Sequence, residues 1–523
     1  MKDYREIDAA LDGMVGDVLA RCMAWVGEDA CGNTVLVDPH DGEAVGHHYS
    51  LSHFGAALVL GWPEGSPEFE LGVRVLEGVL ERWSADSATP GFHCDFNNFA
   101  LCLALLGLNG AGSCVGLRER IARTVGEAPD SAHDTVNWLP MRMVAADMRS
   151  RWHGDGRGDA VLTRCRGLVA AAVNPDGLVE DRLPRGVSFN LQYDISTVAG
   201  LDVAARMGVV QPLDLDRCLA ALLGALLPDG DPNYLGRGCN QIFAWGPWLY
   251  LLKARGPQWA WELSSGYLAR RLPAMLANEN LLLNDLPGAE RGLWWDYHHC
   301  SVYTAHLLLW LVLARRLRMP ECSEACVPLS LDGSGSGVAV RGGEGWRVVT
   351  FSGRGEYLAE RGPSVCAVWT ERLGALHKGA FGPWLRPFGL AHSSPAVAQN
   401  WFGLLGVDGW GGSGLREGLG ALKGLLRGGD SFSGTRVRPL FAPVSAGEED
   451  GRLAVTYAPG RLRHACFNLP LLDGAAAAQI EVFADGAPVP LREAGSIVTQ
   501  YGREALFQSG IAKAREWKVR VGI

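Results

Sequence analysis

The stretch His93-Cys94-Asp95-Phe96-Asn97-Asn98-Phe99 carries polar and aromatic side chains, and it leads directly into the almost wholly apolar residues 100–108. A helix that is apolar on every side is buried, so the stretch predicts an inner helix with a polar start. Clusters of the same character recur at intervals of roughly 40–60 residues, a spacing typical of helical-hairpin repeats. These further clusters occupy residues 47–54, 133–138, 188–194, 238–245 and 294–299.

Helices of a different kind are expected between the clusters. Residues 68–84, 115–127 and 213–226 have apolar positions on one face and polar positions on the other, which is typical of helices at a protein surface. Buried helices surrounded by amphipathic partners describe an (α/α)6-type toroid, with the polar clusters lining a single mouth. We predict that this toroid comprises residues 1–328.

The character of the sequence changes near residue 329. Glycine-rich turns separate short β-type runs, a pattern that favours an antiparallel β-sandwich over residues 329–523. These runs are residues 337–340, 346–351, 364–369, 453–457 and 478–483. A chain of 523 residues is also too long for one ordinary core. The expected fold class is therefore multidomain α+β, with an N-terminal toroid followed by a C-terminal antiparallel β-sandwich.

The composition restricts the partners of the protein. A net charge of −9 argues against nucleic acid and anionic membranes, and no run reaches the roughly 18 apolar residues of a membrane span. The 13 cysteines form no CxxC pair and the histidines show no HExxH spacing, so we expect no metal and no cofactor. Free thiols and the lack of a signal-peptide pattern favour a cytoplasmic protein, or a secreted or periplasmic one if a leader was removed. Homo-oligomerisation is left open.

One polar cluster has the groups that a β-elimination requires. Asn190 and Tyr193 stand three residues apart and share a face at a helix start, and Arg182 and Arg185 precede them. The C5 proton of a uronic acid becomes acidic enough only when hydrogen bonds neutralise its carboxylate. A tyrosine can then act as the base if nearby cations lower its pKa. A capped helix with a partly buried tyrosine explains the same residues equally well.

The order of a toroid followed by β-sheets resembles the heparinase II/III-like and chondroitin AC-type polysaccharide lyases over nearly the whole chain. The resemblance implies that Asn137, in Val136-Asn137-Trp138-Leu139-Pro140, neutralises the substrate carboxylate, and that Tyr193 is the catalytic tyrosine. It also implies a catalytic histidine, which the chondroitin-type enzymes carry several residues before that tyrosine. Residues 185–192 contain no histidine, so His48 and His299, each in a polar cluster, are the candidates.

Further cluster residues are expected to bind the substrate. Indole faces can stack on sugar rings, and amides and guanidinium groups can bind hydroxyl and carboxylate groups. The residues expected in this role are Asn98, Trp138, Arg182, Arg185, Gln241, Trp245, Trp294, Trp295 and Tyr297. Packing in the core is the structural alternative for each tryptophan taken singly.

The favoured function is a lyase that cleaves an acidic, uronic-acid-containing polysaccharide or oligosaccharide, and two alternatives stay open. A glycoside hydrolase on the same toroid would use a pair of carboxylates. Its candidates in the clusters are Asp95, Asp134, Asp194 and Asp296. A non-catalytic glycan-binding protein would need the aromatic cleft without the reacting groups. The products distinguish these functions, because elimination leaves a C4–C5 double bond whereas hydrolysis adds water.

Overall fold

The computed structural model describes most of the chain, and every structural statement below concerns the described part. The described residues are 4–39, 42, 44, 49–85, 93–131, 134–154, 156–183, 186–188, 191–235, 242–277, 300–317, 326–351, 364–385, 438–439, 444–458, 463–471, 474–499, 502–510 and 512–523.

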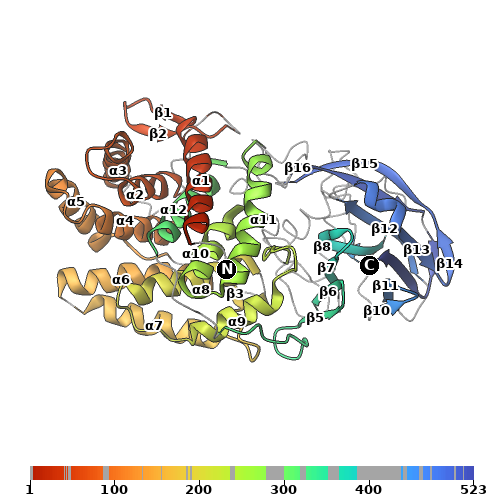
Figure 1. Cartoon of the computed structure of the whole chain (residues 1–523). Helices are drawn as coiled ribbons and strands as arrows, with labels where there is room; N and C mark the ends of the chain where they lie inside the picture. The colour runs from red at the N-terminus through yellow and green to blue at the C-terminus, as the bar shows by residue number, and fades with distance from the viewer. Residues whose placement is uncertain are drawn as a thin grey trace, which may run out of the picture.

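The N-terminal part is a closed ring of helices in two layers (Figure 1). The inner helices are α2 (Ser50–Gly61), α4 (Cys94–Gly107), α6 (Leu139–His153), α8 (Leu191–Arg206), α10 (Trp245–Arg255) and α12 (Cys300–Arg316). The outer helices are α1 (Tyr4–Met23), α3 (Pro67–Ala85), α5 (Val115–Glu127), α7 (Arg157–Ala172), α9 (Leu215–Ala225) and α11 (Gln258–Ala277). Each inner helix contacts the next one along the chain, and α12 contacts α2, so the ring closes. The predicted toroid is confirmed.

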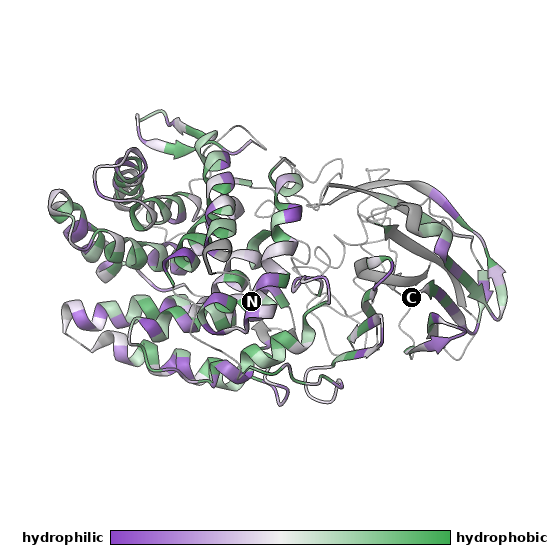
Figure 2. Cartoon of the chain, viewed as in Figure 1, coloured by the Kyte–Doolittle hydropathy of each residue, from purple (hydrophilic) through white to green (hydrophobic). Residues whose placement is uncertain are grey.

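The two layers differ in how much of each helix is apolar. Residues 50–60 of α2 and 300–314 of α12 are all buried, as expected for helices that are surrounded on every side. By contrast, α5 buries the stripe Leu117, Ile121 and Val125, whose four-residue spacing keeps them on one face. Figure 2 shows this mixed colouring on the outer helices. The inner helices also approach one another closely, because a Cβ at Gly107 of α4 would lie 2.6 Å from the carbonyl oxygen of Val59.

A buried carboxylate joins the beginning of the toroid to its end. The hairpin of β1 (Val26–Glu28) and β2 (Thr34–Leu36) follows α1 and leads to Asp38, which is fully buried. The Asp38 carboxylate accepts hydrogen bonds from the backbone N–H of Ser301 at 2.7 Å and from its hydroxyl at 2.6 Å. Asp38 therefore satisfies free N–H groups at the start of α12 and holds the first and last segments of the ring together.

The C-terminal part consists of two antiparallel sheets. The larger sheet has nine strands in the described part of the chain: β5 (Val338–Gly343), β6 (Trp346–Phe351), β7 (Ser364–Thr370), β8 (Gly374–Leu385), β9 (Arg438–Pro439), β12 (Arg463–Leu471), β15 (Leu491–Thr499), β16 (Gly502–Ser509) and β17 (Ala512–Ala514). The five-stranded sheet contains β10 (Val444–Glu449), β11 (Arg452–Tyr457), β13 (Ile480–Ala484), β14 (Ala487–Val489) and β18 (Trp517–Gly522). The expected fold class, a helical toroid followed by a β-sandwich, is thus confirmed.

The nine-stranded sheet packs against the five-stranded sheet on one face and against the toroid on the other. On β6, Val348 belongs to the core between the two sheets, whereas Val349 and Phe351 belong to the core that continues into the toroid. This alternation follows from the two-residue period of a strand. The Ser336 hydroxyl and backbone N–H both donate to the Asp176 carboxylate, at 2.8 and 2.7 Å, and fix the connecting segment on the toroid. The division at residues 328 and 329 stays a prediction, and it falls between α12 and β5.

Candidate active site

The described residues of the polar clusters lie together at one end of the toroid, where the inner helices begin; we call this end the mouth. The ring of His306 on α12 stacks on Phe243, with centroids 4.1 Å apart, and lies 5.9 Å from the ring of Tyr49. His93 in turn lies 5.6 Å from Trp138. Side chains from five different inner-helix segments therefore meet, as the repeated clusters predicted for one shared opening.

Two buried histidines form part of this mouth. His53 Nδ1 lies 2.9 Å from the carbonyl oxygen of Tyr49. Because a carbonyl can only accept, Nδ1 carries the proton and Nε2 is left as an acceptor, for which the described residues supply no donor. Burial lowers the pKa of His53 to about 3. Burial also lowers the pKa of His306 well below its usual value, with His53 adding to the effect. The rings, 5.2 Å apart, are therefore neutral at neutral pH.

Sequence reasoning did not assign a role to His53 or His306. His53 stands in the first cluster, and His306 stands seven residues after His299, two turns along a helix. Both histidines stand in otherwise apolar helices, and this pattern could have marked them as candidate site residues, since burying an imidazole is costly unless it is hydrogen-bonded. Among the described residues, neither nitrogen of His306 has a hydrogen-bond partner.

Asn137 is the most informative of the predicted site residues. It lies in η2 (Val136–Trp138), directly before α6, and its side chain is 2% exposed. Its amide carbonyl oxygen is fully buried, and no group in the described part of the chain hydrogen-bonds to it. Leaving a buried polar group unsatisfied costs about 1–3 kcal/mol. A buried amide in this state is suited to bind a ligand or a water molecule.

The fold brings the element of Asn137 against those of two other predicted residues. The η2 turn contacts α8, whose first turn carries the partly exposed Tyr193. It also contacts β3 (Asp181–Leu183), which carries Arg182 and pairs with β4 (Gly186–Ser188) in a hairpin before α8. Segments from two distant parts of the sequence thus meet where the elimination chemistry was expected.

Three further predicted residues are tightly packed. Trp138 is 7% exposed and makes an edge contact with Phe96. Asn98 is fully buried and donates to the carbonyl of Pro129 at 3.5 Å. Trp245 is fully buried, and its ring stacks on Tyr267 of α11 at 5.3 Å, between the inner and outer helices. A substrate-binding role for these side chains stays a prediction.

Several predicted residues lie outside the described part of the chain, and so does the side chain of Arg182. The residues concerned are His48, Arg185, Asn190, Gln241, Trp294, Trp295, Tyr297 and His299.

The aspartates of the clusters have protein partners. Arg142 on α6 is 2% exposed and donates to Asp95 through Nε at 3.2 Å and Nη2 at 2.9 Å. Its Nη1 donates to Asp134 at 2.9 Å, and Arg164 also pairs with Asp134. Burial raises the pKa of Asp95, and Arg142 opposes that rise. Both carboxylates are therefore tied to arginines that hold the mouth together.

Asp194 has a different environment and lies away from any arginine partner in the described chain. It is 1% exposed, and its Oδ2 accepts from the backbone N–H of Val179 at 3.1 Å. Burial raises the pKa of Asp194 well above its usual value. The contact to Val179 anchors the turn that precedes the β3–β4 hairpin, so Asp194 positions this turn. The fourth aspartate, Asp296, lies outside the described residues.

Within the described residues, no three His, Cys, Asp or Glu side chains gather closely enough to hold a metal ion. None of the described helices has the length and apolar character of a bilayer-spanning helix.

The fold defines a protein with a helical toroid and a β-sandwich, and the chain was compared with known proteins. No protein-family model matches the chain, and no curated protein matches it. Among solved structures, heparan sulfate lyase HepC from Pedobacter heparinus has 10% identity and a TM-score of 0.36, covering 98% of this chain and 82% of its own. The GH76A α-1,6-mannanase of Salegentibacter sp. HEL1_6 has 11% identity and a TM-score of 0.40, covering 58% of this chain and 99% of its own. A protein described as a possible GH105 member from Salmonella enterica has 11% identity and a TM-score of 0.37, covering 58% and 93%.

Proposed function

We propose that this chain is a glycan-active enzyme that cleaves a uronic-acid-containing polysaccharide or oligosaccharide by β-elimination at the mouth. The observation that supports this best is Asn137, whose buried amide oxygen has no hydrogen-bond partner among the described residues. It lies on a turn that contacts the helix start bearing Tyr193 and the strand bearing Arg182. A sugar hydroxyl could donate to the unsatisfied Oδ1, and the Nδ2 amino group of the same amide can donate to a substrate carboxylate.

In the proposed reaction, the Asn137 amide donates to the carboxylate of the uronic acid, and the Arg182 guanidinium pairs with it. Neutralising this carboxylate makes the C5 proton more acidic and stabilises the enolate that forms when the proton leaves. Tyr193 then removes the C5 proton as the general base. The electron pair then forms the C4–C5 double bond while the bond from C4 to the leaving oxygen breaks. Tyr193 returns its proton to that oxygen, with His48 or His299 assisting.

The environment of the aspartates favours elimination over hydrolysis. A glycosidase needs two carboxyl groups that face the substrate, one as acid and one as nucleophile or base. Asp95 and Asp134 instead share the guanidinium of Arg142, and Asp194 binds the backbone of Val179. These contacts give Asp95 and Asp134 structural roles, whereas Asp194 keeps a buried Oδ1 without a hydrogen-bond partner among the described residues and is the remaining described candidate for hydrolysis.

The test is to incubate the protein with a panel of uronic-acid glycans and to follow the near-ultraviolet absorbance of the unsaturated product. Tyr193→Phe and Asn137→Ala are compared with the unchanged protein. We expect the absorbance to rise with the unchanged protein and not with either variant. New reducing ends without the absorbance would assign hydrolysis instead. Glycan binding without either product would indicate a binding protein.

A further inference from the structure

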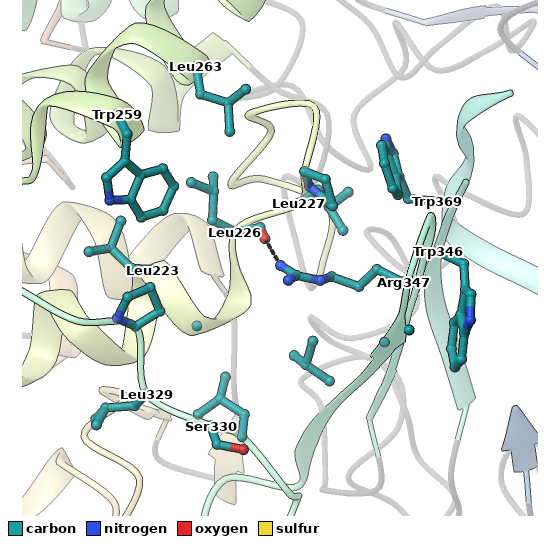
Figure 3. Close-up of a pocket in the computed structure, with 17 residues that line it drawn as sticks. Leu223, Leu226, Leu227, Trp259, Leu263, Leu329, Ser330, Trp346, Arg347 and Trp369 are labelled. Carbon is teal, nitrogen blue, oxygen red and sulfur yellow. Dashed lines mark hydrogen bonds between the residues drawn. The ribbon is translucent and has the colours of Figure 1, made fainter. Parts of the chain in front are cut away.

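A cavity lies between the toroid and the nine-stranded sheet (Figure 3). Its volume is about 510 Å³, within the usual range of small-molecule sites, roughly 300–1,000 Å³. One wall is formed by the end of α9, the loop after it and the start of α11. The other wall is formed by β5, β6 and β7, and the segment 328–331 lies across one side. No described residue of the polar clusters belongs to its lining.

Arg347 on β6 is the charged group of this cavity. Its Nη1 donates to the carbonyl oxygen of Leu226 at 2.7 Å, in a partly buried position. A guanidinium has five N–H donors. In the described part of the chain, no carboxylate lies within ion-pair distance of Arg347, and the Leu226 carbonyl is its one hydrogen-bond acceptor. A partly desolvated guanidinium with unused donors favours an anion, above all a carboxylate that it can bind through two parallel hydrogen bonds.

The neighbours of Arg347 leave its guanidinium open to the cavity. In the sheet register, Arg347 lies between Trp369 on β7 and Gly342 on β5. A side chain at position 342 would begin 3.9 Å from Arg347 Nε, so the glycine leaves this side uncovered. On the facing wall, the indole of Trp259 is 46% exposed. Figure 3 shows Arg347 reaching toward Leu226, with Trp369 beside it and Trp259 on the opposite wall.

We infer that this cavity is a second saccharide-binding site, selective for a sugar that carries a carboxylate. The carboxylate pairs with Arg347, and the apolar face of the ring lies on the indole of Trp369 or Trp259. Aromatic walls with one placed charged group are the usual construction of a small-ligand site. The ligand class rests on the proposed function, because an enzyme of acidic glycans meets such sugars. A sugar held here would contact the toroid and the sheet at once.

The test measures binding of glucuronate and galacturonate to the full chain by calorimetry or ligand-detected NMR. A monosaccharide has no glycosidic bond to cleave, so binding is separated from turnover. We expect both uronates to bind, and glucose and acetate to bind at least tenfold more weakly. Arg347→Gln should weaken uronate binding at least tenfold, whereas Arg347→Lys should retain part of it. Trp259→Ala, on a half-exposed side chain, should weaken it severalfold without unfolding the protein.

Asn137→Ala should remove uronate binding at the mouth, and in this background Arg347→Gln should still weaken the remaining uronate binding at least tenfold. Uronate binding that is lost in Asn137→Ala and kept in Arg347→Gln would overturn the inference, as would acetate binding as tightly as the uronates. Absence of uronate binding at millimolar concentration would also overturn it. The absorbance assay is independent of these results. Arg347→Gln should still release unsaturated product from the shortest substrate, so failure of the second site and failure of the elimination give different results.

Discussion

The buried polar groups at the two ends of helix α8 differ in their hydrogen bonding. Near its C-terminal end, Asp202 is fully buried and accepts from Arg206 at 2.7 Å, from the Tyr250 hydroxyl at 2.9 Å and from Arg255. At the mouth, where α8 begins, Asn137 and His306 are also buried, yet the described residues offer no hydrogen bond to Asn137 Oδ1 or to either nitrogen of His306. Buried polar groups are normally satisfied, and exceptions need a reason. Stability accounts for the first end, and the ligand binding that we propose would account for the second.

The largest expected effect is a loss of activity in Tyr193→Phe, which is compared with Tyr250→Phe at the other end of the helix. Tyr193→Phe, at the mouth, should reduce the rate of elimination about 10²–10⁴-fold, because it removes the proton-transfer group. Tyr250→Phe, at the other end, should leave the rate unchanged and lower the free energy of unfolding by about 1–2 kcal/mol, since a hydrogen bond to Asp202 is lost. Initial rates and chemical denaturation measure the two effects. An equal loss of activity in both variants would contradict the division.

Asp202→Ala should have the next largest effect, on stability. The substitution removes the shared acceptor of two arginines and a tyrosine and leaves the buried Tyr250 hydroxyl without it. We expect the free energy of unfolding to fall by about 2–3 kcal/mol, less than for a fully buried pair because Arg206 and Arg255 keep access to solvent. Asp216→Ala is the control: Asp216 also pairs with Arg255 but is 72% exposed. Its effect should stay below about 0.5 kcal/mol.

Low pH should lower the stability of the folded protein through His53, a residue of the mouth. The pKa of His53 is about 3 in the folded protein, below the ordinary value of 6.5, so below pH 6.5 the unfolded chain binds a proton that the folded chain does not. The stability conferred by the neutral ring is therefore complete above pH 6.5 and falls as the pH drops toward 3, by about 1.4 kcal/mol per pH unit for one group. Denaturation at a series of pH values should show a shallower decline for His53→Gln than for the unchanged protein. Parallel curves would mean that His53 already titrates normally.

The smallest expected effect has the opposite sign from the others. Asn137→Leu replaces an unsatisfied amide by an apolar group of similar size, so the free energy of unfolding should stay the same or rise by about 1 kcal/mol while cleavage is lost. The matched variant Asn174→Leu should destabilise by about 1–2 kcal/mol. The Asn174 Oδ1 accepts from the backbone N–H groups of Asp176 and Leu178, and these bonds would be lost. A similar destabilisation by both variants would mean that Asn137 is satisfied in the folded protein.

The fold could be predicted from the sequence because both helix layers leave a signal in the pattern of apolar residues. Boundaries were less exact, for local reasons. The expected helix over 213–226 begins at Leu215, because the Asp214 carboxylate accepts from the N–H groups of Asp216 and Arg217 and caps it. The expected strand over 478–483 begins at Ile480, since residues 474–479 form a 3-10 turn.

The candidate site could be predicted only in part. The meeting of the segments that carry Asn137 and Tyr193 follows from helices that all begin at one end. The pairing of Asp95 with Arg142 does not follow from the sequence pattern, because Arg142 lies 47 residues away and nothing in the pattern links the two residues. The burial of His53 beside His306 depends in the same way on packing across the ring.

The closure of the ring by Asp38 and Ser301, 263 residues apart, has a consequence for how the chain folds. The first inner helix, α2, packs on the last one, α12, so its apolar surface stays uncovered until α12 has been synthesised. Contacts of such sequence separation form slowly, and partly folded chains with exposed apolar faces aggregate. A fragment that stops before residue 300 would therefore need a chaperone, and folding on the ribosome would be completed only after the last helix had emerged.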